Sequence, residues 1–362
     1  MKIKDLTTPQ LIVDKEKLIK NIEEVSNFSK IYKKSLRPMI KTHKSIEIAK
    51  MQKSFGISGI QCAKLSEAEI FSQEFDDIFI SSEIVDEEKL RRAKNLNRKI
   101  KKLILSVDSI EGIRKIKDIF YDEKVYLRIE INSGHNRCGV KPEDVLFLYN
   151  EIKNYENLIF EGIFTHGGHV YNSKSKEERE RASFEEGESL LKAKRILEES
   201  GGKCEVVSVG STPTLFISGK MDGITEIRPG NYVFYDLKQV FLGVQKIDRC
   251  ALFVLSQVIS KPDSKRAFID AGAKVFGLDY LNIDDEKIYG YILEHPNAKL
   301  YSLSEEHGWL KIDEKININI GDKIKIIPVH SCIVMSNFDY FYMVQKDDVL
   351  DKYKVDARGK FE

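Results

Sequence analysis

The chain has 362 residues, of which 42% are hydrophobic, and its 58 basic side chains nearly balance 57 acidic ones. A net charge of +1 gives no electrostatic basis for nucleic acid or an anionic membrane as the main partner. No stretch approaches the roughly 20 apolar residues of a membrane span, and the polar start, Met1 to Gln10, carries no apolar signal core. At this length we expect two domains.

Five cysteines are scattered through the chain without a CxxC pair. Because this odd set offers no disulfide framework, the sequence predicts a protein of the reducing cytoplasm. Cys332 is distinctive, since it follows a histidine by two positions. The other four lie among apolar or strand-like neighbours and are predicted to be buried hydrophobic residues: Cys62, Cys138, Cys204 and Cys250.

The first two thirds of the chain alternate β-rich runs with amphipathic helical segments. A lead-in at 11–14 precedes a helix to about Ser29, and a further helix is expected from Pro142 to Lys153. Eight strands are predicted, near 36–41, 59–64, 77–81, 103–108, 125–132, 160–166, 205–211 and 225–228. Eight strands separated by helices indicate a closed parallel (β/α)8 barrel of the TIM type. An open doubly wound sheet is the alternative, but the GxGxxG turn typical of it is missing.

After about Val240 the pattern changes. Strand-like runs separated by Gly, Asp and Asn turns are expected near 251–260, 266–270, 299–303 and 323–329. Helical periodicity is weak in this region, which favours an antiparallel β domain. The expected division is therefore a barrel over 1–240 and a β domain over 241–362.

Polar side chains are predicted at the C-terminal ends of all eight barrel strands, where the active sites of such barrels gather. Apolar strands that end in polar residues are typical of a catalytic mouth and favour an enzyme, although loops are often polar without a function. The eight strand-end residues are Lys41, Lys64, Ser81, Asp108, Asn132, His166, Ser211 and Arg228.

The segments after the last two strands are typical of a phosphate site. Gly210 to Thr214 joins a glycine turn to a helix start with Ser and Thr caps and a proline, and Pro229-Gly230-Asn231 follows the next strand. Barrels commonly bind phosphate in these two loops, and plain helix capping is the alternative. Phosphate on one side of the mouth and Lys41 at the first strand end together predict pyridoxal 5'-phosphate as the cofactor.

Seven motifs then resemble the D-threonine aldolase and D-serine dehydratase family, which are fold-type III pyridoxal-phosphate enzymes related to alanine racemase. They cover nearly the whole chain in the family's order. The motifs are RPMIKTHK (37–44), CAKLSEAE (62–69), NRCGV (136–140), THGGH (165–169), RPGNY (228–232), SEEHG (304–308) and ARG (357–359). The chain departs at Met39, where family members often have His, and at Ile333, where they often have Pro.

The resemblance implies roles for the mouth residues. Lys41 would form the Schiff base and move protons at Cα, with its pKa lowered by neighbouring cations such as Arg137. His166 would lie beside the pyridine ring, and Arg228 would face the pyridine nitrogen and disfavour its protonation. Lys41, Arg137 and His166 are the predicted catalytic residues. The implied phosphate ligands are Ser211, Thr212, Gly230 and Asn231.

A second motif, His330-Ser331-Cys332, lies in the expected β domain. Residues i and i+2 of a strand point to one face, so His330 and Cys332 could converge on a metal ion and leave positions for water and substrate. An isolated HxC pair also arises by chance. The resemblance supports the metal, because family aldolases carry His-x-Asp at this place and D-serine dehydratases carry His-x-Cys. Thiolate plus imidazole favours zinc.

The resemblance implies a metal-assisted lyase acting on a small D-3-hydroxy amino acid, by dehydration or by retro-aldol cleavage. An amino-acid racemase on the same scaffold is the first alternative; it needs no metal but a second base, for which Tyr340 and Tyr342 are available. A non-catalytic pyridoxal-phosphate carrier is the alternative of another class, although such proteins resemble the barrel alone. By analogy with relatives of this fold, we expect a homodimer with sites completed across the interface.

Overall fold

The computed structural model describes residues 1–313 and 315–362, which pack as two compact units. The barrel unit consists of Glu24–Lys41, Ala49–Gly230 and Lys360–Glu362, and the β unit consists of Met1–Glu23, Thr42–Ile48 and Asn231–Gly359. Each unit is therefore assembled from segments far apart in sequence. The predicted division into 1–240 and 241–362 cuts the chain once and does not include this exchange of segments.

The barrel unit contains eight parallel strands in the order β2-β9-β8-β7-β6-β5-β4-β3. Their bounds are β2 (Ser35–Leu36), β3 (Ile60–Cys62), β4 (Asp77–Ile80), β5 (Lys102–Val107), β6 (Val125–Glu130), β7 (Leu158–Phe164), β8 (Val206–Val209) and β9 (Glu226–Ile227). The ends of the sheet also meet, because Gln61 N–H donates to the Pro38 carbonyl at 2.9 Å and Met39 pairs in parallel with Gln61. The predicted eight-stranded TIM-type barrel is confirmed.

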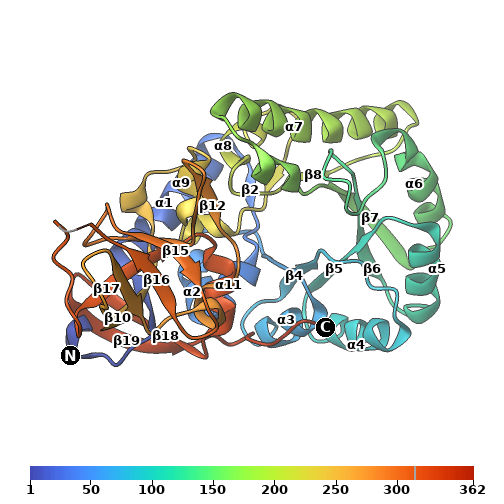
Figure 1. The fold of residues 1–362 in the computed structure, drawn as a ribbon. Coiled ribbons are helices and arrows are strands. Elements are labelled where there is room, and N and C mark those ends of the chain that lie inside the picture. The colour runs from blue at the N-terminus through green and yellow to red at the C-terminus, as the bar shows by residue number, and fades with distance from the viewer. Residues whose placement is uncertain (314) are drawn as a thin grey trace. The chain divides into compact units, whose positions relative to one another are not determined.

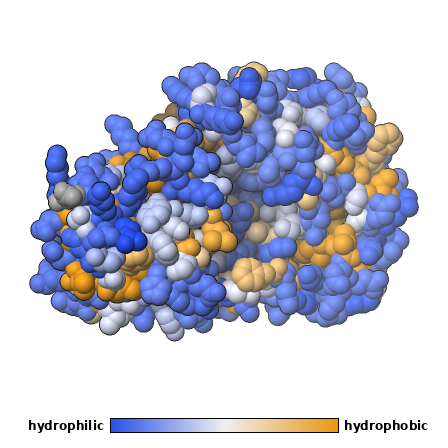
Figure 2. All heavy atoms as spheres, viewed as in Figure 1, coloured by the Kyte–Doolittle hydropathy of each residue, from blue (hydrophilic) through white to orange (hydrophobic). Residues whose placement is uncertain are grey.

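Helices follow the strands as the periodicity predicts. Their bounds are α1 (Lys15–Ile31), α2 (Ile46–Ser54), α3 (Leu65–Phe71), α4 (Glu87–Asn97), α5 (Ile110–Ile119), α6 (Val145–Lys153), α7 (Lys176–Glu199) and α8 (Leu215–Ser218). Asp86, Ser109 and Ser175 cap α4, α5 and α7 by accepting backbone N–H groups of the first turn. In Figure 1 the helices α4 to α7 lie outside strands β4 to β8, and Figure 2 shows mostly hydrophilic side chains on the outer face of α7.

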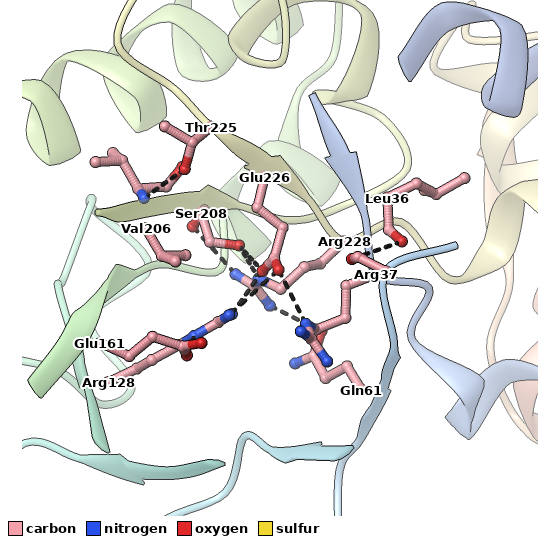
Figure 3. A network of polar contacts seen from close by, with 12 residues as sticks. Leu36, Arg37, Gln61, Arg128, Glu161, Val206, Ser208, Thr225, Glu226 and Arg228 are labelled. Atoms are coloured by element: carbon pink, nitrogen blue, oxygen red, sulfur yellow. Dashed lines mark hydrogen bonds and ion pairs between the residues drawn. The ribbon is translucent and has the colours of Figure 1, made fainter. Parts of the chain in front are cut away.

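A network of charged residues fills the inside of the barrel (Figure 3). Arg128, which has no exposed surface, donates to Glu161 at 2.6 Å and to Glu226 at 2.5 Å. Arg37 donates to the other Glu226 oxygen at 2.9 Å and to Asp77 at 2.6 Å. Because an unpaired buried charge is costly, these residues stabilise the barrel only as a complete set.

The β unit contains a nine-stranded sheet in the order β11-β16-β15-β14-β17-β10-β1-β18-β19. Its strands are β1 (Gln10–Asp14), β10 (Leu252–Ser260), β11 (Arg266–Ile269), β14 (Gly290–Ile292), β15 (Lys299–Leu303), β16 (Gly308–Lys311), β17 (Lys323–Pro328), β18 (Tyr340–Gln345) and β19 (Asp348–Lys354). All pairs are antiparallel except β1 with β18, and a further pairing of β10 with β11 closes six strands into a ring. The predicted antiparallel β domain is confirmed, with the lead-in segment as one of its strands.

Short helices and a small second sheet complete the β unit. They are α9 (Leu237–Phe241), α10 (Ala273–Phe276), α11 (Ser331–Asn337) and a two-stranded sheet of β12 (Leu281–Ile283) and β13 (Glu286–Ile288). Among the described residues, no helix is long and apolar enough to cross a membrane.

Candidate active site

Lys41 lies just beyond β2, in the 3-10 helix η2 (Ile40–Thr42), with its side chain exposed. The predicted strand runs to Lys41, but the observed one ends at Leu36, because Pro38 has no N–H for a strand ladder. Met39 N–H donates to the Pro229 carbonyl at 3.0 Å, which ties this segment to the loop after β9. The lysine therefore occupies the C-terminal end of the barrel, as predicted.

His166 follows β7, and its ring orientation is fixed by a hydrogen bond. Nδ1 lies 2.9 Å from the Gly210 carbonyl oxygen, so Nδ1 carries the proton and donates it. Burial lowers the pKa of His166 to about 3, and the nearby charge of Lys41 acts in the same direction. The imidazole is therefore neutral near pH 7, a flat and weakly polar surface of the kind that packs against an aromatic cofactor.

Arg228 is a buried cation held by several acceptors. Its guanidinium donates to Ser208 Oγ at 2.7 Å, to Gln61 Oε1 at 2.8 Å and to the Thr165 carbonyl. Burial lowers the pKa of Arg228 to about 10, which leaves the group protonated near pH 7. A Cβ at position 210 would lie only 3.0 Å from this guanidinium, so glycine at 210 makes room for it.

The predicted phosphate residues of the barrel lie in two loops. Ser211 and Thr212 are buried, and Ser211 Oγ lies 2.9 Å from Thr214 Oγ1 within the turn that leads into α8. Gly230 is the last residue of its segment in the barrel unit. The structure thus brings Lys41 and His166 together, and it places Ser211, Thr212 and Gly230 after the last two strands of the barrel.

Arg137 has a carboxyl neighbour that the sequence did not indicate. Its guanidinium lies 3.7 Å from Glu130, the last residue of β6, while half of the Arg137 side chain stays exposed. Burial raises the pKa of Glu130 to about 9, and a hydrogen bond to Glu83 adds to the effect. Glu83 in turn accepts from Ser106 Oγ at 2.8 Å. The barrel mouth therefore contains a carboxyl pair as well as cations.

The chemistry of these groups fits pyridoxal phosphate. Lys41 offers an exposed amine, His166 a neutral ring, and Arg228 a fixed cation, while Ser211 and Thr212 lie in a turn at a helix start. Each of these groups can serve one part of a cofactor that carries an aldehyde, an aromatic ring and a phosphate.

His330 and Cys332 do not lie on a strand, so the strand-based argument for their convergence is wrong. Strand β17 ends at Pro328, His330 is the N-cap of α11, and Cys332 is in the first turn of that helix. The two side chains nevertheless interact. Although burial opposes it, the contact with Cys332 and a hydrogen bond with Asp279 raise the pKa of His330 to about 11. A helix N-terminus favours a thiolate, so the observed geometry suits a thiolate ligand.

The second group also contains Asn231 and a buried carboxylate. Asn231 Nδ2 donates to Asp236 at 2.6 Å and approaches Cys332 Sγ at 3.9 Å, and Ser331 N–H donates to Asp236 at 3.0 Å. Cys332 Sγ lies 3.3 Å from Thr42 Oγ1. The structure therefore brings Asn231, predicted as a phosphate ligand, to Cys332 within the β unit.

This second group fits a metal ion. His330 Nδ1 lies 2.6 Å from Asp279 Oδ2, so Nε2 is the nitrogen left to bind a cation, next to the Cys332 thiol. The buried Oδ1 of Asn231 has no hydrogen-bond partner in residues 1–313 and 315–362. Asp236 and Asp279 were missed at the sequence level, because single aspartates in loops carry no motif.

Comparison with known proteins shows which families and enzymes this chain is similar to. A model of the alanine racemase N-terminal domain matches residues 13–238, and a model described as a putative serine dehydratase domain matches residues 251–344. The D-serine dehydratase of Dictyostelium discoideum is 28% identical, with 97% of each chain covered. The D-threo-3-hydroxyaspartate dehydratase of Delftia sp. is 29% identical, with 94% of this chain and 95% of that protein covered.

Solved structures show the same likeness. The D-threonine aldolase of Filomicrobium marinum superposes with a TM-score of 0.92 at 27% identity, covering 99% of this chain and 98% of that one. The Delftia dehydratase superposes with a TM-score of 0.90 at 29% identity, covering 98% of both chains, and a cysteine-to-alanine mutant of it was solved in a metal-free form. The resemblance found in the motifs is thereby confirmed. Since the first family model alone covers more than half of the sequence, the chain belongs to the alanine racemase N-terminal domain family of fold-type III pyridoxal-phosphate-dependent proteins.

Proposed function

We propose that this protein is a pyridoxal-phosphate- and metal-dependent lyase acting on a D-3-hydroxy amino acid. The observation that carries the proposal is the pair of His330 and Cys332, with His330 Nδ1 held by Asp279. The same chain carries the barrel-mouth residues Lys41 and His166. Cys332 contacts Thr42, and Thr42 is the residue after Lys41 in the sequence. Full-length relatives named as dehydratases and aldolases of D-3-hydroxy amino acids support it.

The barrel residues receive distinct roles in this proposal. Pyridoxal phosphate, when bound, supplies an electron sink for the charge that develops at Cα. Lys41 would hold it and move the proton at Cα, and Arg137 would contribute a cation at the barrel mouth. His166 would pack against the ring, and the cation of Arg228 would disfavour protonation of the ring nitrogen. The proposed phosphate ligands are Ser211, Thr212, Gly230 and Asn231.

The β-unit residues act on the β-carbon side of the substrate. A divalent zinc ion, when bound, supplies a Lewis acid for the β-hydroxyl group. His330 Nε2 and Cys332 Sγ hold the ion, and two protein ligands leave positions open for water and substrate. Because thiolate and imidazole favour zinc, and tightly held zinc suits the departure of hydroxide, we favour dehydration over retro-aldol cleavage.

The alternatives receive less support. A racemase requires no metal. The arrangement of His330, Cys332 and Asp279 suits a metal site, so a racemase would have no use for it. A non-catalytic carrier needs only the barrel, whereas the relatives named above match over the barrel and the β unit together. We further propose a homodimer, by analogy of fold, and a cytoplasmic location, because the scattered cysteines offer no disulfide framework. An active monomer in sedimentation would contradict the dimer.

The test uses the purified holoenzyme with D-serine, D-threonine and D-threo-3-hydroxyaspartate, with the L-enantiomers as matched controls. Keto acid and ammonia are assayed against glycine and aldehyde, before and after chelation and after zinc is restored. We expect keto acid from a D-substrate, loss of its formation on chelation and recovery with zinc. Product formation that survives complete metal removal would reject the metal's role, and metal-independent conversion of the D-substrate into its L-enantiomer would favour the racemase.

A further inference from the structure

Three side chains of types that can ligate a metal gather in the loops of the barrel mouth, and none of them belongs to the His330 and Cys332 pair. Glu83 follows β4, Asp108 follows β5, and Cys138 lies in the loop after β6. One ligand atom from each of the three lies within 4.8 Å of the other two, and all three residues are half-buried. Cys138 is thus not the buried hydrophobic residue that its apolar sequence neighbours predict, because two carboxylates lie beside its thiol.

The surrounding chain holds these ligands in place. Ser106 Oγ donates to Glu83 at 2.8 Å, and Gly139 N–H donates to Asp108 at 3.2 Å. Gly139 has φ of +90°, and a Cβ there would lie 2.9 Å from the Asn132 nitrogen, so only glycine lets the loop fold back onto the barrel. The loop after β6 is thereby fixed with Cys138 facing the two carboxylates.

Glu130 supplies the observation that points to a ligand. This residue is only 3% exposed and hydrogen-bonds Glu83, yet its Oε2 is buried without a hydrogen-bond partner in the part of the chain that the structure describes. Buried polar atoms of native proteins are almost always satisfied by protein, water or an ion. An unsatisfied carboxylate oxygen beside Glu83 is therefore aimed at a group that the protein atoms do not provide.

The local charge agrees with a cation as that group. Three carboxyl groups gather here, because Glu130 hydrogen-bonds Glu83 of the group. Two cations act on Glu130: Arg137, at 3.7 Å and half exposed, is largely screened by solvent, and Arg228 is bound to acceptors of its own. Zinc bond lengths of about 2.0–2.3 Å set tetrahedral ligand atoms roughly 3.5 Å apart. Half-buried side chains within 4.8 Å of one another reach that spacing by small rotations.

We propose that Glu83, Asp108 and Cys138 form a second divalent-metal site, with Glu130 as its fourth ligand. Carboxylates alone suit magnesium or manganese, but a thiolate selects a softer ion, so zinc is the expected occupant. Four protein ligands make a closed site of the structural kind, which fixes the loops after β4, β5 and β6. The proposal does not depend on the lyase activity.

The experiment measures zinc per chain by elemental analysis and replaces zinc with cobalt(II) in the purified holoenzyme. We expect two zinc ions in the wild type and one in His330→Ala/Cys332→Ala. Adding Cys138→Ser to that double variant should remove the remaining zinc and the thiolate-to-cobalt charge-transfer absorption. Cys204→Ser, at another buried thiol, is the matched control and should keep both signals. Glu83→Gln, which keeps the side-chain size, should weaken cobalt binding at least tenfold.

Two results would overturn the proposal. One is a His330→Ala/Cys332→Ala protein that binds neither zinc nor cobalt while circular dichroism shows it folded. The other is evidence against a Cys138 thiolate ligand: either a charge-transfer band that survives when Cys138→Ser is added to that double variant, or magnesium binding without any thiolate band, which would leave only an acidic cluster. Failure of the lyase metal gives a different pattern, in which the wild type and His330→Ala/Cys332→Ala bind equal amounts of zinc.

Discussion

His330 Nδ1 lies 2.6 Å from Asp279 Oδ2, across 51 residues of sequence. A carboxylate that accepts the Nδ1 proton fixes the tautomer and the ring plane of a histidine, and it makes Nε2 a better metal ligand. Asp279 itself is not a ligand. In the proposed metal site it would be a positioning residue, whose effect would reach the metal through His330.

We therefore expect Asp279→Ala to weaken zinc binding by about 10- to 100-fold. The measurement is competition with a calibrated chelator on the holoenzyme. Asp351→Ala, which removes an exposed carboxylate on β19, is the matched control and should bind zinc as the wild type does. Unchanged affinity in Asp279→Ala would mean that this hydrogen bond does not orient the ligand.

Lys41 is expected to carry the cofactor. The purified protein should absorb in the region of a protein-bound pyridoxal Schiff base, and borohydride should fix the cofactor to one peptide. Lys41→Ala should lose both signals, whereas Lys64→Ala should keep them. An adduct that maps to Lys44 or Lys64 would refute the assignment.

The lowered pKa of His166 predicts a particular dependence of stability on pH. The folded-state pKa is about 3 and the ordinary value is 6.5, so between these values the unfolded state binds more protons at this site. Stability from this group is complete above pH 6.5 and falls as the pH drops toward 3, with a slope of up to about 1.4 kcal/mol per pH unit.

His166→Gln should flatten this part of the curve. Denaturant unfolding of both proteins between pH 4 and 8 gives the comparison, since other titrating groups contribute equally to each. If the free energy of unfolding changes with pH in the same way for the wild type and His166→Gln, His166 is not neutral and buried in solution.

The charges inside the barrel predict a large loss of stability when one partner is removed. Glu226 is 3% exposed and accepts from Arg37 and Arg128 (Figure 3), so Glu226→Gln leaves two buried cations without their shared counter-ion. We expect the free energy of unfolding to fall by about 3–5 kcal/mol. Guanidinium chloride denaturation measures it, with Glu205→Gln on the surface as control. A loss as small as that of the control would mean that the network is not needed for stability.

The sequence predicts much of the barrel, because each strand and helix there has a local periodicity of its own. The C-terminal strand ends also predict the position of Lys41 and His166, since a parallel barrel brings all such ends to one side. The sequence did not place the lead-in at 11–14 in the β domain, because the pairing of β1 with β10 and β18 is set by residues more than 200 positions away.

The motif of His330 and Cys332 shows a different limit of prediction from sequence. The spacing of His330 and Cys332 suits one face of a strand, but the chain ends its strand at Pro328 and starts a helix at Ser331. Residues spaced as His330 and Cys332 are can approach each other on a strand and also at the start of a helix. The spacing alone therefore did not distinguish a strand from a helix start. Glu130, Asp279 and Glu226 gave no signal at all, because a lone acidic residue acquires its role only from partners brought by the fold.

The choice between dehydration and retro-aldol cleavage rests on Cys332. Its thiolate, at the start of α11 and next to His330, should hold zinc tightly and exchange it slowly. Cys332→Asp replaces the soft ligand with a carboxylate, which favours manganese over zinc more than a thiolate does. We expect the variant to lose at least tenfold in zinc affinity, to respond to added manganese, and to form less keto acid relative to glycine and aldehyde from D-threonine.

The control is Cys332→Ser, which keeps the size of the side chain and should lose zinc without gaining a response to manganese. A carboxylate at Cys250 is unsuitable as a control, because that side chain is buried and the change would unfold the protein. If both the metal preference and the product ratio of Cys332→Asp match the wild type, the second ligand does not set the reaction, and the choice must be made by groups that contact the substrate itself.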